Sequence, residues 1–166
     1  MNVLKDRLIV YDGNCALCSG LKVRAVRYGI IDESDCAAYH TLPAQYSKAI
    51  DPNHFRNEMA LVEKNGGPTL YGVDGLTYVF SVRYPSLRPM FTNSFVQIIL
   101  KTVYSVVAPN RYVISTPPAH VTSCACAPEV SLAVRLRYIL PAHLYAIIAT
   151  ILFGLAVSPL VPGVSS

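Results

Sequence analysis

A Cys-x-x-Cys pair near the N-terminus, set between an apolar run and a helical pattern, most constrains what this chain can fold into. The Leu-Ile-Val run at residues 8–10 predicts a buried strand, and the Asp-Gly that follows it predicts a turn. A helix is expected to start at Cys15, with Asn14 as its N-cap, and to run to about Tyr28. The pair Cys15 and Cys18 would then lie in the first turn of a helix that follows a buried strand.

Two cysteines three residues apart in a helix share one face. The N–H groups at the start of a helix are unpaired, and together with the helix dipole they favour a thiolate over a thiol. A thiolate is the species that attacks disulfides. We therefore predict that Cys15 is the nucleophile, and the more exposed and more ionised thiol, and that Cys18 resolves the mixed disulfide.

Two other interpretations of this pair remain open. A structural zinc site needs a second pair of ligands, and the other cysteines are Cys36, Cys124 and Cys126, of which the last two are too close for the usual knuckle. Both thiols could instead be small core residues. A haem attachment site would need His directly after the second cysteine, where Ser19 stands. The strand–turn–helix setting favours a redox pair, without cofactor or metal.

Several further residues are candidates for a site. Asp12, three residues before the first cysteine, could relay protons to a thiol or could shape the turn. Cys36 is predicted to be a core residue. The Cys-x-Cys at residues 124–126 could be unpaired, a second and strained dithiol, or half a metal site. Four histidines show no metal-ligand spacing: His40, His54, His120 and His143.

The rest of the first two thirds alternates strand and helix patterns. The pattern predicts strands at 35–42, 58–63 and 69–71 and helices at 43–50, 73–84 and 94–108, with turns at 51–53 and 65–67. Gly29 is expected to end the first helix. This order resembles a thioredoxin-like α/β sheet with flanking helices and the dithiol at the end of the first strand.

The motif DGNCALC at residues 12–18 resembles the DCC family of thiol-disulfide oxidoreductases, whose signature is matched by Asp12, Cys15 and Cys18. The resemblance covers residues 6–115 or so, and its further matching segments are 59–62, 71–76 and 110–112. It implies a thiol-disulfide oxidoreductase on a thioredoxin-like fold. Thioredoxins place a cis-proline before the third strand, where this chain has Glu58 and Met59, so substrate binding through that proline is not implied. The segment 110–112 is interpreted as closing the domain rather than binding a ligand.

The C-terminal third differs in composition from the rest. The chain is 52% hydrophobic and only 14% charged, against roughly 25% charged in soluble domains. No Asp, Glu, Lys or Arg follows Arg137. The run 142–161 is long enough to cross a bilayer as a helix, and Arg135 and Arg137 before it predict that the N-terminal part faces the cytoplasm. A buried helix or hairpin packed on the domain or on a partner is the alternative.

These patterns predict three parts: a dithiol domain at 1–115, a linker at 116–137, and a hydrophobic tail at 138–166 that forms a membrane helix. No secretory leader is expected, because charges at residues 5–7 interrupt the first apolar stretch. No basic run interleaved with aromatics suggests nucleic acid. The predicted function is thiol-disulfide exchange with a protein or small-molecule substrate. The alternative is a non-enzymatic, membrane-tethered binding module or complex subunit on the same fold.

Overall fold

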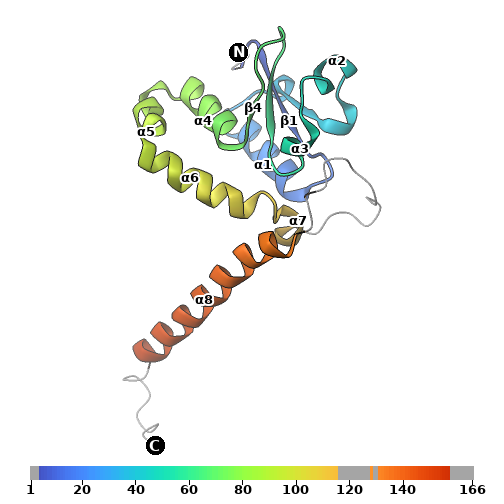
Figure 1. Cartoon of the computed structure of the whole chain (residues 1–166). Coiled ribbons are helices and arrows are strands. Elements are labelled where there is room, and N and C mark those ends of the chain that lie inside the picture. The colour runs from blue at the N-terminus through green and yellow to red at the C-terminus, as the bar shows by residue number, and fades with distance from the viewer. Residues whose placement is uncertain (1–3, 116–127, 129–130, 158–166) are drawn as a thin grey trace, which may run out of the picture. The chain divides into compact units, whose positions relative to one another are not determined.

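A computed structural model describes residues 4–115, residue 128 and residues 131–157 of this chain (Figure 1). The chain divides between residues 129 and 130 into two compact units. The division falls within the stretch that the sequence predicted as a linker. Cys124, Cys126 and His120, named above as candidates, lie outside the described residues.

The first unit is built on a four-stranded mixed sheet with the order β2-β1-β3-β4. The four strands are β1 (Arg7–Tyr11), β2 (Cys36–Ala38), β3 (Ala60–Glu63) and β4 (Leu70–Tyr71). Strand β2 pairs with β1 in parallel, whereas the pairs β1–β3 and β3–β4 are antiparallel. The chain therefore combines a parallel β1–α1–β2 unit with an antiparallel hairpin, and β1 lies inside the sheet.

Helices flank this sheet. They are α1 (Ala16–Arg27), α2 (Ala44–Ser47), α3 (Pro52–Phe55), α4 (Gly72–Arg83), α5 (Arg88–Thr92), α6 (Ser94–Val107) and α7 (Arg111–Ile114), with 3₁₀ turns at Glu33–Asp35, Tyr39–Thr41 and Pro85–Leu87. The predicted mixed α/β class is confirmed, as are helices close to 73–84 and 94–108 and the antiparallel hairpin after residue 63.

Both faces of β1 are buried, which explains its uninterrupted apolar run. Leu8 and Val10 belong to a core cluster that includes Phe55 of α3, and Ile9 points into a second cluster with Val79 of α4. The residues of α1 that pack against this second cluster are Ala25 and Val26. Helices α1 and α4 therefore cover one face of the sheet, and the short helices α2 and α3 cover the other.

Helix α1 ends as predicted but begins differently. Gly29 adopts a left-handed φ of 64°, and the N–H groups of Gly29 and Ile30 bond to the carbonyls of Val26 and Ala25, both at 2.9 Å. These are the two bonds of a Schellman C-cap. At the other end the N-cap is Cys15, not Asn14 as predicted. The predicted cap is wrong by one residue because the cysteine sulfur itself takes the capping role.

Short elements account for the other differences. The strand predicted at 35–42 is only three residues long, because the chain turns into a 3₁₀ helix at Tyr39. The predicted turn after Asp51 is the start of α3, where the Asp51 carboxylate caps the Asn53 N–H at 2.9 Å. Helices α5 and α7 were not predicted, since four or five residues carry too little periodicity to be recognised.

The second unit is one long helix, α8 (Leu132–Val157). It starts about ten residues before the apolar run predicted from the sequence, and residues 158–166 lie outside the described range. The stretch Arg135–Val157 is long and apolar enough to cross a membrane. Two polar side chains in it bond within the helix: His143 Nδ1 lies 2.8 Å from the Ile139 carbonyl oxygen, and Thr150 donates to Ala146 at 2.8 Å. These contacts lower the cost of placing both side chains in an apolar environment.

Candidate active site

Cys15 occupies the N-cap position of α1 with extended backbone angles. Its Sγ accepts a hydrogen bond from the backbone N–H of Cys18 at 3.3 Å, so one unpaired donor of the helix start is directed at the sulfur. The Cys15 side chain is fully buried, with 0% exposed, and Cys18 is half-buried. The prediction that Cys15 is the more exposed thiol is therefore wrong. Cys15, Cys18 and Cys36 are free thiols in this structure.

Ser115, which directly follows α7, lies against the Cys15 sulfur. Ser115 Oγ lies 3.9 Å from Cys15 Sγ and also accepts the N–H of Leu17 at 3.2 Å. The same hydroxyl donates to the carbonyl oxygen of Arg111 at 2.8 Å, which fixes its position after α7. The end of α7 thus lies over the first turn of α1, a contact between residues about one hundred positions apart in the sequence.

The two thiols of the motif differ in acidity. The pKa of Cys15 is lowered to about 6, and the hydrogen bond with the Cys18 side chain is the largest cause. Burial alone would raise this pKa, but the Cys18 N–H, Ser115 and the charge of Arg111 also lower it. The same thiol–thiol hydrogen bond, together with burial, raises the pKa of Cys18. The direction of both shifts is the one expected from the sequence, since the hydrogen bond favours the charge on Cys15 and the proton on Cys18.

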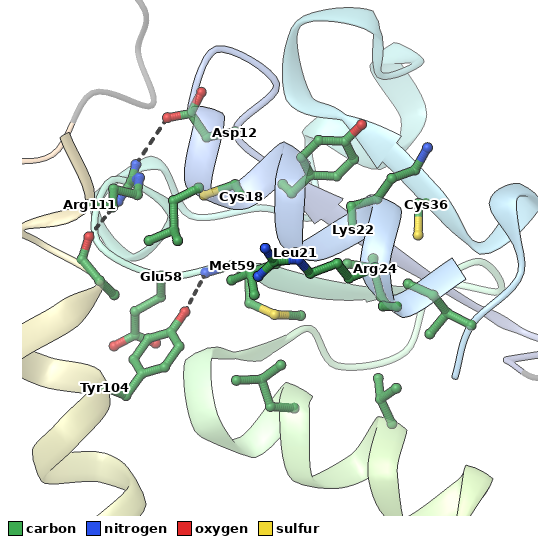
Figure 2. Close-up of a pocket in the computed structure, with 18 of the residues that line it drawn as sticks. Asp12, Cys18, Leu21, Lys22, Arg24, Cys36, Glu58, Met59, Tyr104 and Arg111 are labelled. Atoms are coloured by element: carbon green, nitrogen blue, oxygen red, sulfur yellow. Dashed lines mark hydrogen bonds and ion pairs between the residues drawn. The ribbon is translucent and has the colours of Figure 1, made fainter. Parts of the chain in front are cut away.

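Asp12 takes part in a buried polar cluster at the end of β1. Its Oδ1 accepts the N–H of Asn14 at 3.0 Å, which shapes the turn. Its Oδ2 accepts bonds from the Arg111 guanidinium at 3.3 Å and from the Tyr112 hydroxyl at 2.7 Å, and both side chains of the ion pair are almost fully buried. Figure 2 shows the Asp12–Arg111 pair beside Cys18. Asp12 could relay protons or shape the turn, and its bond to the Asn14 N–H is a contact of the second kind.

The cluster anchors α7 to the dithiol loop. Arg111 also donates to the carbonyl oxygens of Arg56 at 2.9 Å and Ala108 at 3.1 Å, so its charge is held at one place near both thiols. Burial is the first cause that raises the pKa of Tyr112, followed by its bond to Asp12, which keeps the hydroxyl a donor. The interpretation of 110–112 as only a closing segment was incomplete. The sequence signal was a charged and polar triplet after a long apolar helix.

A cavity of about 440 Å³ lies beside Cys18. Its wall is mainly apolar and is built from α1, α4 and α6 on the side of the second core cluster; side chains that line it include Leu21, Ala25, Met59, Leu76, Val79 and Phe80. Cys36 also lines this cavity, apart from Cys18 (Figure 2), and burial raises its pKa to about 12. A cavity of this size and polarity is suited to an apolar molecule or side chain next to a reactive thiol.

Glu58 and Met59, which the sequence comparison aligned with the proline of thioredoxins, both line this cavity. The N–H of Met59 donates to the Tyr104 hydroxyl of α6 at 3.0 Å, so a bound peptide could not use that N–H unless Tyr104 moved (Figure 2). Burial raises the pKa of Glu58 above that of an ordinary carboxyl. This end of the cavity therefore offers a carboxyl group and a phenol as polar contacts.

The remaining candidates lie outside this arrangement. A Cβ at residue 13 would lie 2.5 Å from the ring carbon Cε1 of the exposed His40 and 2.8 Å from the Cβ of Ala38 on β2, and the second contact favours glycine in the motif because Ala38 has no side-chain torsion that could relieve it. His54 packs its ring on Tyr71, with centroids 5.0 Å apart. Within the described part of the chain, no three His, Cys, Asp or Glu side chains gather as a metal site would require.

Comparison with known proteins gives no relative for this chain: no family model, no curated protein and no solved structure matches it. The function must therefore be argued from the site itself.

Proposed function

We propose that this protein is a thiol-disulfide oxidoreductase of the DCC type, with Cys15 as nucleophile and Cys18 as resolving thiol. The observation that carries this proposal is the N-cap position of Cys15, where its sulfur accepts the Cys18 N–H and its pKa is lowered to about 6. A structural thiol in an apolar core has the opposite property, because burial alone raises a thiol pKa. Cys36, with its pKa raised by burial, is the example within the same unit.

The reaction follows from these states. The Cys15 thiolate attacks one sulfur of a substrate disulfide, the substrate S–S bond breaks, and one substrate thiolate leaves. Cys18 then loses its proton to solvent or to the departing thiolate and attacks Cys15 Sγ. A Cys15–Cys18 disulfide forms, and the second substrate thiolate is released. Two electrons pass from the dithiol to the substrate, and the same steps in reverse oxidise a substrate dithiol.

Access to Cys15 requires a movement. The sulfur is fully buried and Ser115 lies against it, so the substrate can reach it only when the end of α7 shifts. Cys18 lines the apolar cavity without such a movement. We place the apolar part of the substrate in this cavity, with its disulfide at the α1 end. The roles of Asp12 and Arg111 are positional: they hold α7 and a positive charge beside the thiols.

The arrangement of the strands supports a thioredoxin-like fold. The chain has a parallel β1–α1–β2 unit followed by an antiparallel β3–β4 hairpin and α4, and the dithiol stands between β1 and α1. This is the order that the resemblance to the DCC family implies.

We further propose that α8 holds the protein in a membrane with the dithiol unit on the cytoplasmic side. The two arginines near its N-terminal end, Arg135 and Arg137, support this orientation. The second candidate function is a membrane-tethered binding module. It is favoured by one observation, the complete burial of Cys15, which a protein without turnover would tolerate.

A trapping experiment separates the two functions. Full-length Cys18→Ser protein in detergent micelles is incubated with a small disulfide or with cell extract, and adducts are mapped by mass spectrometry. The enzyme account predicts a mixed disulfide on Cys15 in this variant. The adduct should be lost when Cys15→Ser is added to Cys18→Ser, and should be unchanged when the matched control Cys36→Ser is added instead. Wild-type protein should reduce a disulfide in repeated turnovers when a thiol donor is supplied. No adduct on Cys15 and no turnover would support the binding module instead.

A further inference from the structure

Helix α6 carries its most apolar side outward. Phe95 and Ile98 are 70% and 63% exposed, and Val103 is 56% exposed, whereas Gln97 and Tyr104 are half-buried on the inner side. A surface helix of a globular protein normally has the reverse arrangement, with the apolar stripe facing the core. We name Phe95, Ile98, Ile99 and Val103 the outer face of α6.

The exposed apolar surface continues into the preceding segment. Met90 of α5 and Leu87 before it are also exposed. Asn93 separates the two helices, since its side-chain oxygen caps the N–H groups of Phe95 and Val96 at 2.9 and 3.3 Å. The segments before and after Asn93 meet at an angle of 85°. Several large apolar side chains exposed on neighbouring segments of a folded unit usually mark an interaction surface.

Length decides the kind of contact that α6 can make with lipid. A helix of 14 residues is about 21 Å long, shorter than the roughly 30 Å hydrocarbon core of a bilayer. The sharp bend at Asn93 prevents α5 from extending it. The outer face is therefore suited to lying along a membrane surface rather than crossing it.

The charge of this segment matches an anionic lipid surface. From residue 75 to residue 115 the sequence contains no Asp or Glu, while Arg83, Arg88 and Lys101 are basic. Lys101 pairs with Asp74 at 3.1 Å, and this exposed ion pair is weak enough to exchange for a lipid phosphate. The stretch from residue 85 to residue 107, which contains the outer face of α6, therefore carries Arg88 and Lys101 and no carboxylate, a composition found in helices that bind the membrane interface.

A membrane-inserted α8 would bring the first unit to the bilayer surface. Helix α8 is long and apolar enough to span, and residues 116–131 connect it to Ser115. A chain of that length extends at most about 60 Å, so a membrane-inserted α8 keeps the first unit near the bilayer. Tethering raises the local concentration of the unit at the surface and makes even a weak apolar contact effective.

We propose that the outer face of α6, with Leu87 and Met90, lies in the headgroup region of the bilayer that holds α8, as a second and peripheral membrane contact. This contact goes beyond the proposed redox function and does not depend on the dithiol. It would orient the first unit on the membrane instead of leaving it free on its tether.

The test uses the absence of tryptophan from the sequence. Three full-length variants each carry one Trp: Phe95→Trp on the outer face, Gln45→Trp on α2, and Phe153→Trp in α8. Gln45 is exposed, and α2 and α6 lie at different ends of the first unit (Figure 1). Each variant is reconstituted into vesicles of phosphatidylcholine and phosphatidylglycerol, with either normal or brominated acyl chains, and the Trp emission is recorded.

The proposal predicts that brominated lipid removes most of the emission of Trp at positions 95 and 153 and leaves that at position 45 nearly unchanged. Adding Val103→Glu to Phe95→Trp should restore much of the emission, because a carboxylate on the outer face opposes contact with acyl chains and with anionic headgroups. Quenching at 153 alone would overturn the proposal and show that protein or water covers the outer face. Quenching at neither 95 nor 153 would overturn it together with the membrane role of α8.

Discussion

The ion pair between Asp12 and Arg111 links the dithiol loop to α7 through two almost fully buried charges. Removing one partner of such a pair leaves the other charge buried without its counter-charge, which costs about 3–5 kcal/mol. Asp12 also accepts a hydrogen bond from the Tyr112 hydroxyl, so removing its carboxylate breaks the side-chain bonds of two residues of α7.

We therefore expect Asp12→Asn to lower the free energy of unfolding by about 3 kcal/mol, and Arg111→Met to do the same. The double variant should lose clearly less than the two single losses combined, because no unpaired charge remains. Denaturant unfolding of the full-length protein in micelles measures this. Lys101→Gln, which removes the exposed partner of Asp74, is the control and should cost no more than about 0.5 kcal/mol. Additive losses at 12 and 111 would contradict the pairing.

At this scale the sequence predicted the residues of the motif but not their partners. Asp12, Cys15 and Cys18 are recognisable because their spacing is local. Arg111 and Ser115 act on Cys15 from about one hundred residues away, and no local pattern reports a contact at that separation. The predicted exposure of Cys15 was wrong for the same reason, since the residue that lies against its sulfur belongs to a different element.

Among the elements, α1 depends on a reactive side chain for its N-cap. Serine keeps an acceptor at this position and alanine does not, and loss of an N-cap costs about 1 kcal/mol. We expect Cys15→Ala to be less stable than Cys15→Ser by about this amount in thermal or denaturant unfolding. Both variants lack the nucleophile, so any difference between them reports the cap rather than redox state. Equal stability would show that the sulfur contributes nothing to the start of the helix.

The Tyr104 hydroxyl of α6 accepts a hydrogen bond from the N–H of Met59, the residue before β3. Tyr104→Phe should leave the Met59 N–H without its partner and lower the free energy of unfolding by about 1–3 kcal/mol. Tyr28→Phe, at a tyrosine that is 71% exposed, should change it by less than about 0.5 kcal/mol. Similar values for both variants would mean that the hydroxyl of Tyr104 does not hold α6 to the sheet.

Elements with strong local signals were predictable. Helix α4 ends before Pro85 and α6 has a regular apolar periodicity, and both were predicted to within one residue at their ends. The orientation of α6 was not predictable, because its helical periodicity gives an apolar face without saying whether that face is buried. The strand β2 was too long in the prediction, since alternation continues past Ala38 while the backbone turns.

For the whole molecule, the composition change after the first two thirds predicted an apolar helix, and the structure extends it toward the N-terminus to Leu132. We expect the full-length protein to stay in the membrane fraction through a carbonate wash. A chain truncated after Ser115 should be released by carbonate, because an interfacial contact alone is reversible. A full-length protein that is soluble and monodisperse without detergent would contradict a membrane-spanning α8.

The central claim is that Cys15 is a thiolate near neutral pH, and its alkylation as a function of pH tests this most directly. Full-length reduced protein is treated with iodoacetamide across a pH series, and the label on each cysteine is quantified by peptide mapping. The rate for Cys15 should rise with pH through a midpoint near 6, since its thiolate forms there, while Cys36, with a pKa of about 12, should still be rising at the alkaline end. Burial slows the Cys15 reaction at every pH but leaves the midpoint in place. A Cys15 midpoint near 9.0, the ordinary thiol value, would contradict the proposed nucleophile.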